Sequence, residues 1–106
     1  MIQGDVCWYT FREPDKRRPV LVLTSSELIS KLTEITVASI TTTTRDVSSQ
    51  VWLDEADGLG EECAVNLLSI QTVLKSKLGK VTTHLSPERM REVREAIEFA
   101  FNLQNL

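Results

Sequence analysis

The sequence predicts a mainly β fold, a small curved barrel with helices appended, in a single domain over residues 1–106. Three observations predict this fold class: short runs of β-branched and aromatic residues recur, turn-forming residues separate them, and a long helical pattern is confined to the C-terminal end. A chain of 106 residues is large enough for one core and too small for two. Its apolar runs fall far short of the roughly 20 residues of a membrane-spanning helix, and no secretory pattern opens the chain, so we expect a cytosolic protein.

The strands and a short helix are predicted from local patterns. Residues 4–11 are rich in β-branched and aromatic side chains, which suit a half-buried strand. Residues 19–23 form a second, wholly apolar strand. Thr24 and Glu27 match a capping box, which predicts a short helix over residues 28–32. Alternation and turn signals predict further strands over residues 35–41, 50–53, 63–68, 70–74 and 81–83.

The long C-terminal helix has a clear start and an apolar face. Ser86 is expected to be the N-cap, and Pro87 occupies the first helical position. Phe99 falls outside the apolar face, by chance or as a contact for a partner. The face that should pack on the sheet comprises Met90, Val93, Ile97, Ala100 and Phe101, widened by Ala96 and Leu103.

The sequence indicates no metal site and no disulfide framework. Cys7 and Cys63 lie far apart without a Cys-x-x-Cys spacing, so each is expected to be a small buried residue. Residues 54–62 carry five acids, but their spacing fits no calcium loop, and we expect a solvated turn. His84 is expected to be structural or solvated, because no Ser, Cys or carboxylate is arranged as its partner.

Three cations, Lys16, Arg17 and Arg18, run directly into the second strand. Pro19 fixes its own backbone angle and pushes the preceding residue toward extended geometry. Arg18 is therefore held at the mouth of a buried strand, which is the rigid base that a catalytic or phosphate-binding arginine needs. Taken alone, these residues also suit a solvated loop that leads into a core strand.

Four hydroxyls and a guanidinium follow one another in Thr41, Thr42, Thr43, Thr44 and Arg45, at the end of the strand predicted over residues 35–41. Threonines favour strands, so they could simply solvate the edge of a sheet. The functional interpretation is that these side chains contact phosphates and sugars, as hydroxyls and arginines commonly do.

The net charge of −3 argues only weakly against a nucleic-acid partner, because the excess acid lies in the second half of the chain. Residues 1–53 carry six cations and six anions, whereas residues 54–106 carry six and nine. This distribution leaves room for a separate basic face, made of Arg12, Lys16, Arg17, Arg18, Arg45, Lys75, Lys77 and Lys80.

Four segments, taken together, carry a resemblance to a known family. They read GDVCW from residue 4, RRPVLVL from residue 17, VASIT from residue 37 and IQTV from residue 70, the last before a basic turn. Each is weak alone, but their order and spacing over nearly the whole chain are specific. In these segments the sequence resembles the MazF/PemK/Kid family of bacterial toxins.

This resemblance implies an SH3-like barrel of the MazF, Kid and CcdB toxin type that forms a homodimer. It implies a metal-independent endoribonuclease without cofactors, the toxin of a type II toxin-antitoxin system, which cuts single-stranded mRNA at a short sequence and so inhibits translation and growth. A cognate antitoxin is also implied, whose extended tail would occupy the RNA groove. Two alternatives stay open: a non-enzymatic, gyrase-inhibiting toxin on a similar barrel, and a barrel that binds RNA without cutting it.

By the same resemblance, the catalytic arginine falls on Arg18 and the catalytic hydroxyl on Thr41. In metal-free RNA cleavage the 2′-hydroxyl attacks phosphorus, leaving a 2′,3′-cyclic phosphate and a 5′-hydroxyl end. Arg18 can stabilise the charge on the phosphoryl oxygens by a bidentate contact, and Thr41 can donate a further hydrogen bond to them. The expected RNA-binding residues are Lys16, Arg17, Thr42, Thr43, Thr44, Arg45, Gln71, Lys75 and Lys77.

The sequence departs from the family in two places that concern acids. The segment from Arg12 to Arg17 is shorter than in many relatives and has no counterpart of their glutamate. Leu68 and Ser69 stand where many relatives carry an acid. Glu13 or Asp15 could act as the acid or base instead, and the general base stays open.

Overall fold

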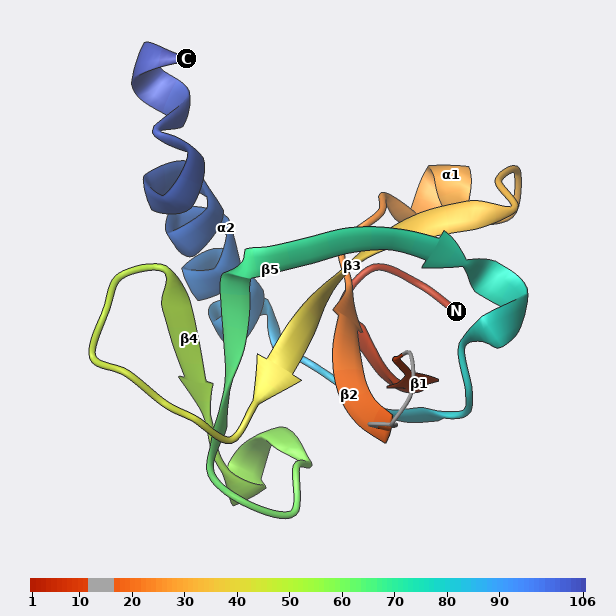
Figure 1. Cartoon of the computed structure of the whole chain (residues 1–106), viewed down its shortest axis with the longest axis horizontal. Helices are drawn as coiled ribbons and strands as arrows, with labels where there is room; N and C mark the ends of the chain where they lie inside the picture. The colour runs from red at the N-terminus through yellow and green to blue at the C-terminus, as the bar shows by residue number, and fades with distance from the viewer. Residues whose placement is uncertain (12–16) are drawn as a thin grey trace.

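The computed structural model describes residues 1–11 and 17–106, which form one six-stranded antiparallel sheet with a long helix packed against it (Figure 1). The strand order is β4-β5-β3-β2-β1-β6, so β4 and β6 form its two edges. The prediction of a mainly β fold with a long C-terminal helix is confirmed. The elements are β1 (Asp5–Thr10), β2 (Arg17–Val22), α1 (Ser26–Ile29), β3 (Glu34–Thr41), β4 (Gln50–Leu53), β5 (Cys63–Leu74), β6 (Val81–His84) and α2 (Pro87–Phe101), with 3₁₀ turns at η1 (Glu55–Asp57), η2 (Lys75–Lys77) and η3 (Leu103–Asn105).

The central strands are buried on both faces, which explains the unbroken apolar run of β2. Val20 packs with Val37 in a cluster that includes Ile29 of α1, whereas Leu21 packs with Ala38 in the cluster under α2. Adjacent residues of a strand point to opposite faces, so an apolar run without alternation fits a strand covered on both sides. The sheet is therefore a rigid base for the side chains at the ends of its strands.

β5 is one strand, not the two predicted over residues 63–68 and 70–74. Its pairing with β3 shifts register between Ala38 and Ser39, whose partners are Ile70 and Asn66. The extra residues on β5 form a bulge, and a bulge bends a strand and increases its twist. Figure 1 shows β5 turning sharply at its middle, so that the sheet curls toward a half-barrel.

The predicted capping box before α1 is wrong. The N-cap is Ser25, without a side-chain hydrogen bond, and the helix covers Ser26–Ile29 instead of residues 28–32. Thr24 Oγ1 accepts the amide of Thr36 at 2.8 Å. The Thr24 hydroxyl is thus used by the neighbouring strand β3, a tertiary contact that the local pattern could not reveal.

The start of α2 agrees with the prediction, but its apolar face is shorter than predicted. Ser86 Oγ accepts the amide of Arg89 at 3.1 Å, and Pro87 opens the helix. Phe101 and Leu103 stay 45% and 41% exposed, because the end of the helix projects past the sheet (Figure 1). The buried part of the face consists of Val93 and Ala96, with Met90, Ile97 and Ala100 partly buried.

The acidic loop before β5 is more ordered than the solvated turn that the sequence predicted. Asp54 and Asp57 form a reciprocal capping box around η1. Asp57 Oδ1 also accepts the Nε of Arg89 at 3.0 Å, and its side chain is only 8% exposed. Burial acts to raise the pKa of Asp57, but the hydrogen bonds from Arg89 and from the Asp54 amide outweigh it and hold this pKa below its ordinary value.

His84 has a carboxylate partner, contrary to the expectation from the sequence. Its Nδ1 lies 2.9 Å from Oδ1 of Asp5, which is buried and also accepts the amide of Ile2. The two residues face each other across β1 and β6. The partner stands 79 positions away in the chain, so His84 is structural through a pairing that only the fold creates.

The cysteines behave as predicted. Cys7 and Cys63 are free and buried, and burial raises the pKa of both thiols. Within residues 1–11 and 17–106, no cluster of His, Cys, Asp and Glu could hold a metal ion. In the same described ranges, every helix is too short or too polar to cross a bilayer.

Candidate functional site

A groove opens where β2 and β3 separate. The two strands pair from Val22 and Val37 as far as Val20 and Ser39, where the pairing stops. Beyond that point β2 continues along β1, and β3 continues along β5. The sheet therefore splits at the mouth of β2, directly after Pro19.

Arg18 and Thr41 lie on the two strands that separate at this split. Arg18 lies two positions before Val20 on β2, and Thr41 lies two positions after Ser39 on β3, where Val20 and Ser39 are the last pair between the strands. Both residues line a single groove of ≈ 660 Å³. Because each strand remains paired on its other side, the backbones of both residues are held by the sheet while the space between them stays open.

Within residues 1–11 and 17–106, the Thr41 hydroxyl donates no hydrogen bond, so its proton is available to a ligand. Thr41 Oγ1 accepts the amide of Thr43 at 3.0 Å. A hydroxyl that already accepts can still donate one hydrogen bond. Thr42 and Thr43 line the same groove, so three of the four threonines predicted for this site gather there.

An arginine stacked on a tryptophan forms another wall of the groove. The guanidinium carbon of Arg17 lies 4.6 Å from the ring centroid of Trp8. Arg17 pairs with Thr10 and Pro19 pairs with Trp8, so Arg17 and Trp8 are diagonal neighbours on one face of the β1–β2 ladder. This cation–π contact fixes a positive charge beside Arg18, on a half-buried aromatic surface.

Glu61 also lines the groove, a place that the sequence alone did not predict. It comes from the loop before β5, together with Gly58, Leu59 and Gly60. The reason is the pairing of β3 with β5: Ala64 lies opposite Thr41, so the residues just before β5 must reach the same end of the sheet. In the sequence this residue is only an acid close to the start of a strand. Its place in the groove could not be inferred without the long-range pairing of β3 with β5.

The other predicted RNA-binding residues lie elsewhere or outside the described part. Thr44 lines a separate pocket of ≈ 400 Å³, shared with Glu62 and Arg89. Lys75 Nζ donates to the carbonyl of Ile29 at 2.7 Å, which makes it a structural contact near α1. Arg45, Gln71, Lys75 and Lys77 do not line the groove, and Lys16, Glu13 and Asp15 fall in residues 12–16, outside the described residues.

Among the described residues, the site combines two arginines, several hydroxyls, an aromatic ring and one carboxylate at a split in a curled sheet. Bidentate arginines and hydroxyl donors are the groups that recognise phosphate oxygens. The fold and the site thus define a small β protein suited to binding a phosphate-bearing chain in an open groove.

Comparison with known proteins identifies the family. The sequence matches the PemK-like, MazF-like toxins of type II toxin-antitoxin systems over residues 2–101. It is 38% identical to "Endoribonuclease MazF3" of Mycobacterium tuberculosis, over 84% of this chain and 86% of that protein, and 36% identical to "Probable endoribonuclease MazF5" of the same organism, over 92% and 90%. The chain therefore belongs to the PemK-like, MazF-like toxin family.

The solved structures agree with this assignment. The fold superimposes on "Mycobacterium tuberculosis toxin MazF-mt6" with a TM-score of 0.85 and 33% identity, covering 92% of this chain and 96% of that one. A mycobacterial endoribonuclease solved with its cognate antitoxin gives a TM-score of 0.84 at 23% identity, covering 97% and 96%. The toxin-type barrel predicted from the sequence is confirmed, and the names of the relatives agree with the predicted endoribonuclease class.

Proposed function

We propose that this protein is a toxin endoribonuclease that cleaves single-stranded RNA in the β2–β3 groove. The observation that supports the proposal is that Arg18 and Thr41, from the two strands that separate, line one groove. A phosphate between them would receive hydrogen bonds from both strands, and the rigid sheet would hold both donors in place before the substrate arrives.

In the proposed reaction the 2′-hydroxyl attacks the adjacent phosphorus. The new P–O2′ bond closes a 2′,3′-cyclic phosphate, and the P–O5′ bond breaks to release a 5′-hydroxyl end. Arg18 stabilises the growing charge on the phosphoryl oxygens, and the Thr41 hydroxyl donates a hydrogen bond to the same oxygens. Protein side chains alone supply these contacts, so we propose that the reaction needs no metal ion.

Glu61 is our proposed general base. An arginine stays protonated under ordinary conditions and cannot accept the proton of the 2′-hydroxyl. Glu61 is the carboxylate among the described residues that line the groove. In this scheme it takes the 2′-hydroxyl proton as the P–O2′ bond forms, and the departing O5′ takes a proton from water.

Single-stranded RNA is the substrate that this groove fits. The Arg17 guanidinium is stacked on the Trp8 ring and offers its outer plane, on which an unstacked base can lie. Bases inside a duplex are already stacked and are not available for such a contact. The exposed Arg17 and Arg18 also attract the phosphate backbone in a salt-dependent way.

The family supports a proposal about partners and location. We propose that the chain acts in the cytoplasm as a homodimer and is held inactive by a cognate antitoxin. Structural neighbours include one endoribonuclease solved with its cognate antitoxin and MazE–MazF complexes from Deinococcus radiodurans. The relatives named as endoribonucleases favour RNA cleavage over gyrase inhibition or RNA binding alone.

The experiment that tests the proposal is cleavage of a long single-stranded RNA by the purified chain in EDTA. We expect discrete fragments with 2′,3′-cyclic phosphate and 5′-hydroxyl ends, which end-labelling distinguishes from 3′-hydroxyl ends. The same sequence annealed into a duplex is the control and should stay intact. Tight binding without cleavage of any single-stranded RNA would contradict the proposal and favour a binding barrel.

A further inference from the structure

Asp57 lies at the start of the loop that lines the β2–β3 groove, residues 58–61, called here the groove loop. Each oxygen of its carboxylate has its own donor: Oδ1 accepts the Nε of Arg89 at 3.0 Å, and Oδ2 accepts the amide of Asp54 at 2.9 Å. Its backbone carbonyl accepts the Thr83 hydroxyl at 3.1 Å. Three elements, η1, β6 and α2, therefore hold the groove loop at this one residue.

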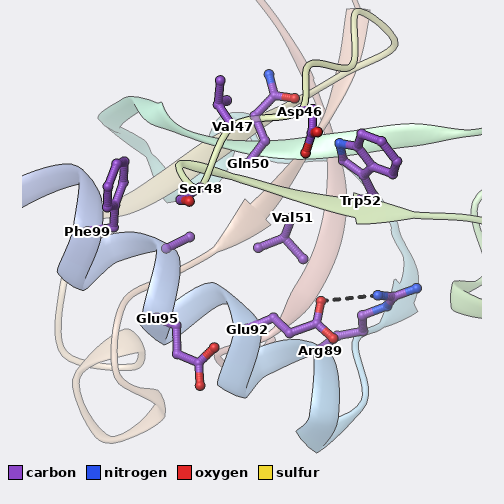
Figure 2. A pocket seen from close by; sticks show the side chains of 11 residues that line it. Asp46, Val47, Ser48, Gln50, Val51, Trp52, Arg89, Glu92, Glu95 and Phe99 are labelled. Carbon is purple, nitrogen blue, oxygen red and sulfur yellow. Dashed lines mark hydrogen bonds and ion pairs between the residues drawn. The ribbon is translucent and has the colours of Figure 1, made fainter.

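Arg89 is itself oriented by a second carboxylate. Its Nη1 donates to Oε1 of Glu92, on the same helix, at 3.1 Å, an ion pair that Figure 2 shows as a dashed line. The two bonds use different nitrogens of one planar group, which fixes the direction of the Nε–H toward Asp57. The side chains of Arg89 and Asp57 are 26% and 8% exposed, so solvent screens their contact less than it screens an ordinary surface pair.

The rest of the groove loop has few attachments of its own. Leu59 packs against the core cluster under α2, but a Cβ on Gly60 would meet no atom within 4 Å. Leu59, Gly60 and Glu61 have no partner among the hydrogen bonds found in the described residues. At the far end of the loop, the chain enters the sheet at Cys63. The position of Glu61 therefore depends on the two ends of the loop, of which one is Asp57.

The placement of Glu61 matters for the proposed reaction. A general base must lie within hydrogen-bond reach of the proton that it takes, and a displacement of about 1 Å can slow a reaction by about 100-fold. Without Arg89, the carboxylate of Asp57 would lose its cationic partner in a place that water hardly reaches. A buried charge without a partner is strongly unfavourable, so the carboxylate would move toward water and take the groove loop with it.

We propose that Arg89 is a positioning residue, which holds the groove loop through Asp57 and so keeps Glu61 in place for proton transfer. The inference rests on the proposed function, because Glu61 acts as the base only if the chain cleaves RNA. Arg89 does not line the β2–β3 groove, so it acts on the rate through the loop and not through a contact with the phosphate.

The test compares R89M with R91M in the intact chain. Methionine keeps most of the aliphatic stem but none of the donors, and Arg91 is an exposed arginine of the same helix that does not line the groove. Saturating protein with limiting single-stranded RNA gives the rate constant of the bound complex. We expect R89M to lower this rate constant by about tenfold or more and R91M to leave it nearly unchanged. Both variants should bind an RNA with a 2′-deoxy residue at the cleavage site within about twofold of the unaltered chain.

The comparison of rate with binding separates positioning from a loss of folded protein. Unfolding of a fraction of R89M would lower the amount of RNA cleaved, but it would not change the rate constant of the bound complex. D57N should slow the bound complex in the same way, and R89M/D57N should be no slower than the slower single variant, because both changes break one bond. Additive losses, equal rates for R89M and R91M, or weaker binding at an unchanged rate would each overturn the proposal.

A measurement without RNA distinguishes failure of this inference from failure of the proposed function. In NMR relaxation of the free chain, the order parameter of the Glu61 amide should be about 0.85 in the unaltered chain and in R91M, and it should fall below about 0.6 in R89M. Equal order parameters in all three proteins would overturn the anchoring, whatever the chain does to RNA. If the unaltered chain cleaves no RNA, the proposed function fails, and the order parameters still decide whether Arg89 holds the loop.

Discussion

The Nε of Arg89 donates to Oδ1 of Asp57 over 3.0 Å, and this bond ties α2 to the loop that forms one wall of the β2–β3 groove. Asp57 ends the 3₁₀ turn η1, and Gly58, Leu59, Gly60 and Glu61 follow it into the groove. The C-terminal helix thus has two roles: it covers the core with Val93 and Ala96, and it positions a loop of the candidate site.

The first prediction concerns the pH dependence of this contact. The pKa of Asp57 is lowered in the folded chain, since the hydrogen bonds from Arg89 and the Asp54 amide outweigh the effect of burial. Its stabilisation is therefore complete above the unfolded pKa, near 3.8, and is lost as the pH falls through the lower folded pKa. D57N should cost about 1–3 kcal/mol at neutral pH, because it removes a charged hydrogen bond from a partly buried site. Urea unfolding from pH 7 to pH 2 should show that the free energies of unfolding of the two proteins converge only in acid. A difference in free energy that stays constant over this range would contradict the assignment.

The second prediction concerns the turn at Gly58. This glycine has a φ of 89°, and a Cβ there would overlap the side chain of Thr83. G58A should therefore destabilise the chain by more than about 1 kcal/mol, from backbone strain together with displacement of β6. Gly60 is the matched control in the same loop, because a Cβ at this position would meet no other atom within 4 Å. G60A should leave the urea midpoint nearly unchanged, and equal midpoints for the two variants would contradict the prediction.

Local patterns predicted the elements whose signals lie within a few residues. Pro19 followed by an apolar run indicated β2, and Ser86 with Pro87 indicated the start of α2. The capping box at Thr24 failed because its hydroxyl accepts the Thr36 amide from another strand. A local pattern of five residues cannot show whether this hydroxyl caps a helix or accepts an amide from another strand.

The part of the candidate site that lies on β2 and β3 could be predicted from the sequence. Arg18 and Thr41 could be placed together from the motifs at the ends of β2 and β3. Glu61 could not, because its place depends on the pairing of Thr41 with Ala64 and on the bond between Asp57 and Arg89. Lys75 lies in a basic turn at the other end of β5 from the groove, so its predicted RNA contact stays a prediction.

The third prediction separates the groove arginine from a nearby exposed arginine. R18A should reduce RNA cleavage by about 100-fold or more, because it removes the proposed stabilisation of the phosphoryl oxygens. R18K should recover little activity, since lysine lacks the bidentate geometry. R45A is the control, because Arg45 does not line the groove and bonds to Gln50 and Trp52 through its main chain. Single-turnover cleavage rates measure the effect, and equal losses for R18A and R45A would remove Arg18 from its proposed role.

The fourth prediction concerns the Thr41 hydroxyl. T41V keeps the shape of the side chain but loses the proton donor, so cleavage should slow by about 10-fold or more. T41S keeps the hydroxyl and should retain most of the activity. Serine can also accept the hydrogen bond from the Thr43 amide, so the pair tests both functions of the hydroxyl together, as donor and as acceptor. If T41S and T41V lose activity equally, the side-chain methyl group matters and the proposed donor role is wrong.

The last prediction tests Glu61 as the base. E61A should slow cleavage by about 100-fold or more while binding of an RNA with a 2′-deoxy residue at the cleavage site stays nearly constant. Glu62 is the neighbouring acid but lines a different pocket, so E62A is the matched control and should cleave at close to the original rate. Added acetate should restore part of the activity of E61A, because a free carboxylate can occupy the space left by the side chain and accept the 2′-hydroxyl proton. Acetate should not rescue R18A, which lacks a cation and not a base. Rescue of both variants, or of neither, would mean that Glu61 positions the loop and that another group accepts the 2′-hydroxyl proton.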